Sequence, residues 1–250
     1  MYHGTFFLRN RPALELMRRI VPERGDGSRL HVAVLGCSIG VEVYSILWVL
    51  RPARPELEIV VHAVDTSPEV LELGRDGLYG PETSDLVGSP IFERLTEAEL
   101  GEMFDWEDGA ARVKQWLRGG VEWHVDDACD PELRARLGGQ DVVVASNFLC
   151  HMDDASAERC LRNMAGLVEP GGFMFVSGVD LDVRARVALD LGWEPVSELI
   201  EEVHDGDPSV RNDWPWQWWG LEPLDRTRPG WETRYAAVFR VGARAEAQPA

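Results

Sequence analysis

The residues best suited to chemistry fall in one strand–turn–helix–strand unit over 30–65. The run LHVAVL predicts a first strand, GCSIG at 36–40 a glycine turn, VEVYSILWVL a helix, and EIVVHAV a second strand that ends at Asp65. Gly36 and Gly40 would let the backbone turn sharply and approach a ligand, and a carboxylate at a strand end can accept hydrogen bonds from ribose hydroxyls. The unit therefore indicates a site for a nucleotide-type cofactor. A plain strand-to-helix turn and a helix-capping acid are the alternatives.

The same turn also spells Gly-x-Ser-x-Gly, the pattern that presents a nucleophilic serine in α/β-hydrolases. Ser38, Asp180 and His204 even follow in the chain order of such a triad. However, that turn normally follows several strands, whereas here it follows the first expected one. The hydrolase interpretation also leaves Asp65 without a role, and we disfavour it.

Strand patterns alternate with helix patterns along most of the chain, which is typical of a parallel sheet covered on both faces. We expect a doubly wound, mostly parallel α/β sheet whose last strands form an antiparallel edge hairpin. The expected strands are 30–35, 58–64, 121–125, 141–145, 173–177, 196–203 and 234–241. The expected helices are 13–20, 41–50, one that begins at Pro68, 131–137, 154–167 and 183–191.

A single domain over 1–242 is expected, followed by a disordered tail at 243–250. Within it, 1–29 should be a helical lead-in. The polar, weakly periodic segment 80–120 should be an irregular excursion above the strand ends, and 205–232 a Trp-rich lid or loop.

Composition narrows the range of functions. The chain has 250 residues, 45% of them hydrophobic, and 43 acidic against 25 basic residues give a formal net charge of −18. Such a charge repels polyanions, so we expect no nucleic-acid partner. No apolar run is long enough to span a membrane and no signal peptide is evident, which favours a cytoplasmic protein without a membrane partner. Four scattered cysteines and the adjacent polar residues 151–154 do not suggest a metal site.

Several short motifs carry a resemblance when they are read in order. They are Thr5-Phe6-Phe7-Leu8-Arg9, Gly40-Val41-Glu42-Val43-Tyr44-Ser45, Ala63-Val64-Asp65-Thr66-Ser67, Gly77-Leu78-Tyr79, Ser146-Asn147-Phe148-Leu149-Cys150-His151-Met152 and Pro170-Gly171-Gly172. Together they resemble the chemotaxis-receptor (CheR-type) methyltransferases, a branch of the class I S-adenosylmethionine-dependent methyltransferases. The resemblance spans about 5–177 and implies a Rossmann-like fold and a methyl-transfer activity.

The resemblance implies that S-adenosyl-L-methionine is the cofactor. Asp65 would hold its ribose through charge-assisted hydrogen bonds, and Glu42 its ammonium group, although an acid in a first helical turn is also favoured by the helix dipole. Asp127 and Ala128 would hold the adenine edge. The neighbouring Asp126 leaves this assignment uncertain by one residue. The other residues expected at the cofactor are Thr5, Gly36, Ser38, Gly40, Thr66, Asn147 and Phe148.

Methyl transfer needs mainly alignment of the acceptor and exclusion of water, and alignment can contribute roughly 7 to 11 kcal/mol in favourable models. Arg9 would orient the acceptor, since a guanidinium grips a carboxylate with two parallel hydrogen bonds. His151 could remove a proton from an amine, hydroxyl or guanidine acceptor, or be a helix-start residue without a role. Tyr44 could line the same pocket or simply pack against a helix.

Six of the ten tryptophans lie in the last third of the chain, four of them at Trp214, Trp216, Trp218 and Trp219. So dense an aromatic loop suggests a lid or pocket wall. With His204 and nearby acidic residues, these tryptophans could bind a cationic acceptor by cation–π attraction. A hydrophobic clamp over the sheet edge, or a contact in a homodimer, would explain them equally well.

Departures from the family pattern shape the expected substrate. Only four residues precede Thr5, whereas members of the family usually carry a basic helical domain that reaches the receptor. His151 also stands in place of a tyrosine, and Val43 in place of a proline. We therefore expect a small-molecule or peptide acceptor, with a protein glutamate as the first alternative and a non-catalytic scaffold or sensor that binds the cofactor as the second.

Overall fold

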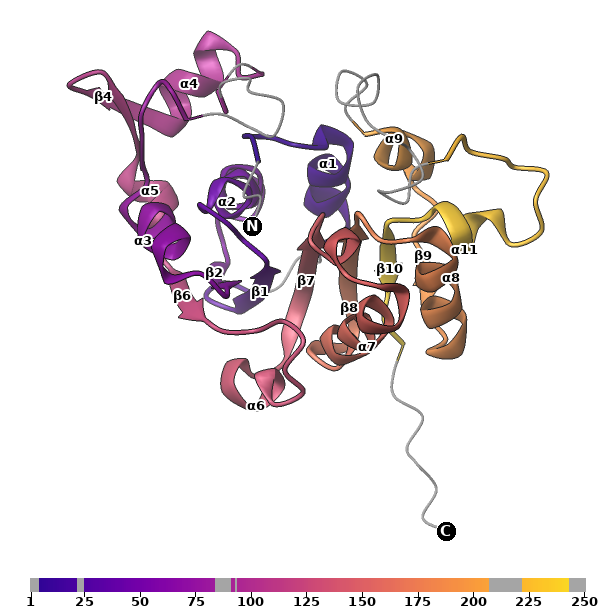
Figure 1. Ribbon diagram of the computed structural model, residues 1–250. Helices are drawn as coiled ribbons and strands as arrows, with labels where there is room; N and C mark the ends of the chain where they lie inside the picture. The colour runs from indigo at the N-terminus through magenta and orange to yellow at the C-terminus, as the bar shows by residue number, and fades with distance from the viewer. Residues whose placement is uncertain (1–4, 22–24, 84–90, 93, 207–221, 243–250) are drawn as a thin grey trace.

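A seven-stranded sheet forms the centre of the protein, in a computed structural model that describes residues 5–21, 25–83, 91–92, 94–206 and 222–242. The strand order is β6-β2-β1-β7-β8-β10-β9. β1, β2, β6, β7 and β8 run parallel, and β10 is antiparallel to both of its neighbours. The expected doubly wound sheet with an antiparallel edge hairpin is confirmed (Figure 1).

The elements of the main unit alternate as the sequence predicts. The sheet strands are β1 Arg29–Leu35, β2 Glu58–Asp65, β6 Val121–Val125, β7 Gln140–Ser146, β8 Val168–Ser177, β9 Glu194–Pro195 and β10 Val238–Arg240. The helices around them are α1 Arg11–Ile20, α2 Val41–Ala53, α3 Pro68–Asp76, α6 Leu133–Leu137, η1 Leu149–His151, α7 Asp154–Ala165, α8 Leu181–Asp190, α9 Ile200–Asp205 and α11 Trp231–Tyr235.

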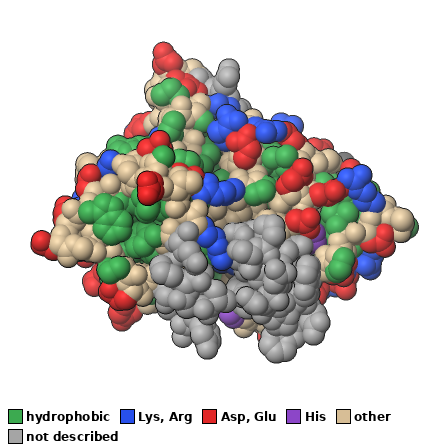
Figure 2. Space-filling view, turned by 90° about the horizontal axis from the view of Figure 1, so that it is seen from above, with side chains coloured by type: hydrophobic (Ala, Val, Ile, Leu, Met, Phe, Trp, Pro, Cys, Tyr) green, Lys and Arg blue, Asp and Glu red, His purple; other side chains and the backbone are tan. Residues whose placement is uncertain are grey.

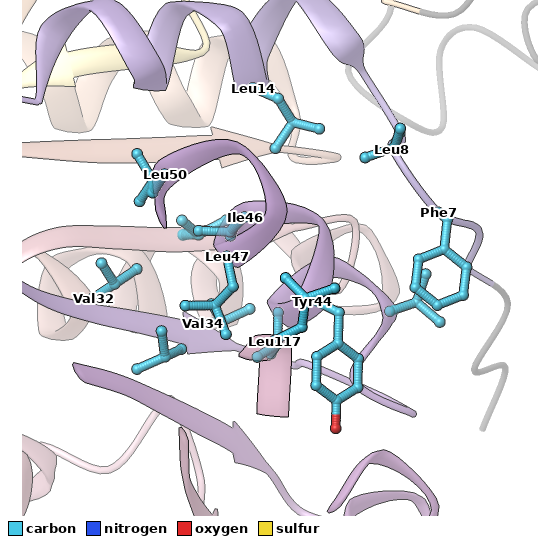
Figure 3. Close-up of a cluster of buried hydrophobic side chains, with 14 of the residues drawn as sticks. Phe7, Leu8, Leu14, Val32, Val34, Tyr44, Ile46, Leu47, Leu50 and Leu117 are labelled. Carbon is cyan, nitrogen blue, oxygen red and sulfur yellow. The ribbon is translucent and has the colours of Figure 1, made fainter. Parts of the chain in front are cut away.

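Two hydrophobic clusters cover the two faces of the sheet. α2 packs between α1 and the sheet, with Ile46, Leu47 and Leu50 directed at Leu14 of α1 and at Val34 of β1 (Figure 3). The second cluster joins the opposite sheet face to α7 and α8. Because both faces of the parallel strands are buried, their sequences are nearly continuous apolar runs, which is why these strands could be predicted.

The edge hairpin differs from the sequence prediction in its details. The segment 196–203 was expected to be a strand, but the strand is the two-residue β9, and the chain then forms helix α9. Similarly, the strand expected over 234–241 begins only at Val238, because α11 occupies Trp231–Tyr235. Val203 and His204 are buried on one side of α9 while Glu202 is exposed, so the apolar residues follow a helical rather than an alternating pattern.

The segment 80–120 was expected to be irregular, but its described part is folded. It contains α4 Glu97–Met103, β4 Phe104–Glu107, β5 Ala110–Val113 and α5 Gln115–Arg118. β5 pairs with both β4 and β3 (Leu78–Tyr79) in a separate three-stranded antiparallel sheet. Asp108 and Gly109 connect β4 to β5 with φ angles of 48° and 84°. An Asp-Gly pair is a hairpin signal, and it could have revealed this sheet.

The surface of the described residues is charged and mixed. Lys and Arg side chains are interspersed with Asp and Glu on the face seen from above (Figure 2). None of the helices in the described ranges is long and apolar enough to cross a membrane.

Candidate active site

A cavity of about 420 Å³ opens where β1, β2 and β7 end and where the loop after β6 begins. Ligands of doubly wound proteins bind at this edge of the sheet, and the volume is within the usual range for small-molecule sites. Of the residues expected at the cofactor, those that line the cavity are Thr5, Gly36, Ser38, Glu42, Asp65, Thr66, Asp127, Ala128, Asn147 and Phe148. The structure therefore brings together residues that are up to 143 positions apart.

Asp65 is the buried acid at the end of β2, with 8% of its surface exposed. Its Oδ2 accepts a hydrogen bond from the backbone N–H of Ser38 (2.9 Å), and its Oδ1 accepts one from that of Ser67 (3.1 Å). Ser38 has a φ of 50°, so the turn is held in a left-handed conformation beside the carboxylate. Each carboxylate oxygen keeps a further lone pair that can accept a hydrogen bond from a ligand hydroxyl.

Gly36 and Gly178 make room for two residues that follow β7. A Cβ on Gly36, whose φ is 65°, would lie 2.8 Å from Cδ1 of Phe148. A Cβ on Gly178 would lie 2.5 Å from Cα of Asn147. The absence of side chains at these glycines lets the Phe148 ring and the Asn147 backbone close one wall of the cavity.

Glu42 lies in the first turn of α2, inside the cavity. Its Oε1 accepts a hydrogen bond from the hydroxyl of Ser146 (2.7 Å) at the end of β7. Burial raises the pKa of Glu42, whereas the Ser146 bond and the charge of Arg9 lower it. A carboxylate that lacks water in this way can be stabilised by a cationic ligand group such as an ammonium.

Asp126 and Asp127 both border the cavity but differ in their partners. Asp126 forms a two-oxygen ion pair with Arg136 at 2.6 and 2.7 Å. Asp127 is exposed, and its Oδ1 accepts a hydrogen bond from the backbone N–H of Cys129. Asp127 therefore keeps more acceptor capacity toward a ligand than Asp126.

Arg9 is held at the cavity by the residues on either side of it. The Phe7 ring is fully buried among the rings of Tyr79, Phe92 and Phe104, with centroid distances of 4.9 to 5.7 Å. The backbone N–H of Leu8 donates a hydrogen bond to Oγ of Ser45 on α2 (3.0 Å). These contacts attach the segment before α1 to both the small sheet and the main unit.

Asn10 completes this attachment on the other side of Arg9. Its side-chain oxygen accepts a hydrogen bond from the backbone N–H of Ala13 (3.1 Å) and so caps α1. Its amide nitrogen donates to the carbonyl of Val203 on α9 (2.9 Å). Arg9 therefore lies between Leu8, whose backbone N–H is hydrogen-bonded, and Asn10, whose side chain is hydrogen-bonded on both sides.

A second, smaller cavity of about 130 Å³ adjoins the first. The two share Phe6, Arg9, Leu14, Glu42, Ser146 and Asn147. Sequence reasoning missed Arg184, a buried residue of α8 that also lines the second cavity. Burial lowers the pKa of Arg184 to about 10, so its side chain is still a cation near neutral pH. A sequence signal for Arg184 does exist. This residue lies three residues after Leu181 and four before Ala188, both buried, and this spacing places an arginine on the apolar face of a helix.

Arg184 is partly satisfied by backbone carbonyls. Its Nη1 donates to Val176 (3.2 Å) and its Nη2 to Arg234 (2.9 Å). Its Nε has no hydrogen-bond partner among the described residues. A buried, unpartnered N–H of a cation is costly, and the positive charge of Arg184 favours an anionic group in the cavity.

Three predicted site residues lie elsewhere. Tyr44 is buried on the far side of α2, where its hydroxyl donates to the carbonyl of Gly74 (Figure 3). It does not line either cavity, so the packing alternative is the one observed. Gly40 begins α2 with a φ of 81°, and a Cβ there would lie 2.6 Å from the Trp123 ring. Its role is to let helix and ring pack closely. His204 lines the second cavity instead of the first.

The remaining residues are placed as follows. His151 is exposed at the rim of the cofactor cavity. The segment 207–221, which contains Trp214, Trp216, Trp218 and Trp219, lies outside the described residues. The hydrolase triad is not formed, because Asp180 caps α8 through hydrogen bonds from the N–H groups of Asp182 and Val183. His204 instead bonds through Nε2 to the carbonyl of Glu222 (2.8 Å).

The strand order, the reversed β10 and a carboxylate-ended β2 beside a glycine turn define a class I methyltransferase fold. A family model described as "CheR methyltransferase, SAM binding domain" matches residues 3–181. The chain belongs to this CheR methyltransferase family, and S-adenosylmethionine is its cofactor. The family resemblance noted in the sequence is thus confirmed.

The chain is similar to several curated proteins and solved structures. The chain is 25% identical over 214 residues to a protein named probable biofilm formation methyltransferase WspC from Pseudomonas aeruginosa, covering 83% of this chain and 48% of that protein. It is 25% identical over 181 residues to chemotaxis protein methyltransferase 2 of Vibrio cholerae, covering 69% and 60%. The chain thus spans about half the length of the curated relatives it matches. The N-methyltransferase NodS from Bradyrhizobium japonicum, crystallised with S-adenosyl-L-homocysteine, matches at 15% identity with a TM-score of 0.41 and covers 75% of each chain.

Proposed function

We propose that this methyltransferase esterifies a carboxylate, carried by a protein or peptide side chain and held by Arg9 and Arg184. The observation that carries the proposal is the second cavity, which adjoins the cofactor cavity, shares Arg9 with it and is also lined by the buried cation Arg184. The relative named as a chemotaxis protein methyltransferase supports a protein acceptor. The acceptor proposed here is therefore the protein-glutamate alternative of the sequence analysis, since no observation favours a free small molecule.

In this proposal the cofactor cavity aligns the methyl donor. Asp65 accepts hydrogen bonds from the ribose, Asp127 and Ala128 lie against the adenine, and Glu42 faces the ammonium group. Bound S-adenosylmethionine supplies a methyl group on a positively charged sulfur, which is already activated for displacement. The neighbouring residues exclude water and fix the direction of attack.

The acceptor side then needs orientation rather than a base. A carboxylate is nucleophilic as it stands, so one of its oxygens forms the bond to the methyl carbon while the carbon–sulfur bond breaks and its electron pair stays on sulfur. Arg9 and Arg184 would hold the second carboxylate oxygen by charge-assisted hydrogen bonds. His151, exposed at the rim, has no proton to remove in this reaction.

The test is to incubate the full chain with methyl-labelled cofactor and peptide arrays that contain glutamate, aspartate, lysine or serine acceptors. Label should appear on carboxylate peptides and be released as volatile methanol by mild alkali, which cleaves esters and leaves N-methyl groups intact. Alkali-stable label, or transfer only to lysine or serine peptides, would contradict a carboxylate acceptor. Cofactor binding without transfer to any acceptor would favour the scaffold alternative.

A matched pair of variants locates the acceptor group. Arg9→Lys keeps the charge but loses the two-pronged geometry, so kcat/KM should fall by about 10- to 100-fold while affinity for S-adenosylhomocysteine is unchanged. Arg18→Lys is the control, because Arg18 is an exposed residue of α1 paired with Glu15. Equal turnover of the two variants would remove Arg9 from the acceptor site.

A further inference from the structure

A cluster of two imidazoles and one carboxylate lies at the edge of the main sheet, outside both cavities. His62 belongs to β2, and Glu122 and His124 belong to the edge strand β6. His62 pairs in register with Glu122, and Val64 pairs with His124. Because alternate residues of a strand point to the same face, all three side chains project from one face of the sheet. This is the face that α7 and α8 cover nearer the centre of the sheet.

The donor atoms of the cluster form a compact triangle. Nδ1 of His62 lies 3.1 Å from Nε2 of His124 and 3.4 Å from Oε2 of Glu122, and Nε2 of His124 lies 3.9 Å from Oε2 of Glu122. An ion at the centre of a triangle with these sides lies about 2 Å from each corner, which matches Zn–N and Zn–O bonds of about 2.0–2.2 Å. The distances between the three donor atoms therefore fit a common ion.

The surroundings suit a ligand set of this kind. The side chain of His62 is 9% exposed, that of His124 30% and that of Glu122 59%. Burial lowers the pKa of His62, which keeps its imidazole in the neutral form that binds metals. The ring of His31 on β1 lies nearly parallel to that of His62, with ring centroids 6.2 Å apart. Glu122 and His124 are open to solvent, so the cluster is accessible to an ion from outside.

We propose that His62, Glu122 and His124 bind a divalent transition-metal ion of the zinc type, which clamps the edge strand β6 to β2. Two nitrogen donors and one carboxylate favour such ions over Mg²⁺ or Ca²⁺, which take oxygen ligands. No local motif reveals this site, because its two histidines are 62 residues apart and come together through the pairing of β2 with β6. The proposal is independent of the methyl acceptor.

The proposed metal site is close enough in sequence to the cofactor site to stabilise it. β2 ends at Asp65, three residues after His62, and the chain reaches Asp127 three residues after His124. Both acids line the cofactor cavity. An ion that fixes these two strands to each other would also fix the relative position of the ribose-side and adenine-side acids.

The direct test is titration of the metal-free full chain with Co²⁺, followed by its visible absorption, and with Zn²⁺, followed by calorimetry. One ion per chain should bind with a Kd of about 1 µM or lower, with the d–d bands of a four-coordinate cobalt site and no thiolate-to-cobalt charge-transfer band. The last point matters because the chain has four cysteines. A strong charge-transfer band, or no saturable binding, would overturn the proposal.

Variants assign the ligands. His124→Ala and Glu122→Gln should each weaken Zn²⁺ binding at least ~10-fold. Glu58→Gln is the matched control, since Glu58 is a similarly exposed carboxylate (55%) on β2 that pairs with Arg29. Zn²⁺ at about 100 times its Kd should raise the Tm of the unmodified chain by roughly 5–10 °C. Equal Zn²⁺ affinity in all three variants, or no thermal shift, would contradict the site.

Discussion

The two adjoining cavities share Arg9 and Glu42, yet they are built in different ways. The cofactor cavity is assembled from strand ends and the turns that follow them, and its buried acid Asp65 already accepts two backbone hydrogen bonds. The second cavity is assembled from α1, α8, α9 and β10, and it holds a buried cation whose Nε lacks a partner among the described residues. The first is therefore organised before its ligand binds, whereas in the proposal above the second gains an anionic partner only when the acceptor binds.

This difference predicts that variants should separate donor binding from turnover. Changes in the cofactor cavity should reduce affinity for the donor, which calorimetry measures with S-adenosylhomocysteine. Changes in the second cavity should leave that affinity intact and lower kcat/KM for the acceptor. A variant that affected both equally would show that the two cavities act as one.

The largest effect is expected for Asp65→Ala. It removes the carboxylate proposed to bind the ribose and leaves the N–H groups of Ser38 and Ser67 without their acceptor. Affinity for S-adenosylhomocysteine should fall at least ~100-fold, about 2.7 kcal/mol. Asp105→Ala is the control, because Asp105 is an exposed residue of the small sheet. Unchanged affinity in the Asp65 variant would refute the cofactor site.

Arg184→Lys should weaken binding of the acceptor without weakening binding of the donor. The substitution retains a charge but cannot reproduce the three donors of a fixed guanidinium, so the KM for a carboxylate acceptor should rise about 10-fold or more. Affinity for S-adenosylhomocysteine should not change, and circular dichroism would check that the fold is kept. A fall in kcat/KM for the Arg186→Lys variant, at an exposed position on the same helix, would show that the effect is not local.

Gly36→Ala and Gly27→Ala test whether the turn after β1 affects donor binding separately from stability. Both glycines have positive φ, 65° and 75°, so either alanine should cost about 1–3 kcal/mol of stability. A Cβ at Gly27 meets nothing within 4 Å, whereas one at Gly36 meets Phe148. Only Gly36→Ala should weaken S-adenosylhomocysteine binding, by about 5- to 10-fold. Equal affinities would mean that the position of Phe148 does not affect the donor.

The smallest effect concerns the ion pair that joins α1 to α4. The guanidinium of Arg11 bonds both oxygens of Glu99 at 2.6 and 2.9 Å and lowers the pKa of Glu99 to about 2. The carboxylate pKa is lower in the folded chain than the unfolded value near ~4.3, so its contribution to stability is present above that pH. That contribution is lost as the pH falls toward 2.

Glu99→Gln should therefore lower the free energy of unfolding by up to about 1 kcal/mol at pH 7, because Arg11 is half exposed and water screens the pair. The difference from the unmodified chain should vanish near pH 2 in denaturant melts. Glu107→Gln, which affects an exposed pair with Arg112, is the control. A difference that persists at low pH would point instead to the N-terminal cap of α4, where Oε2 of Glu99 accepts a hydrogen bond from the backbone N–H of Thr96 (2.8 Å).

Much of the fold could be predicted because it is encoded locally. The run from β1 to Asp65 joins an apolar strand, a glycine turn, a helix and a second apolar strand within 37 residues. By contrast, β9 is two residues long and carries no alternation of its own. Its place is fixed by pairing with β10, which no local pattern reveals.

The residues of the candidate site also divide into those that a local motif reveals and those that it does not. Ten of the eleven residues expected at the cofactor line its cavity, because they sit in short motifs at strand ends. The prediction that Tyr44 lines the site failed because α2 directs its side chain toward Gly74 and Trp123. The motif alone does not show which face of the helix is turned toward the cavity. Arg184 could be recognised only by asking why a cation shares a face with Leu181 and Ala188.

The aromatic cluster around Phe7 has a consequence for protein engineering. Phe92 and Phe104 belong to the stretch between α3 and β6, and Phe7 precedes Arg9 by two positions. An attempt to trim that stretch, or to graft in the equivalent one from a relative, would release the anchor of the arginine at the same time. Chimeras should therefore exchange 5–10 and 78–118 as a matched set.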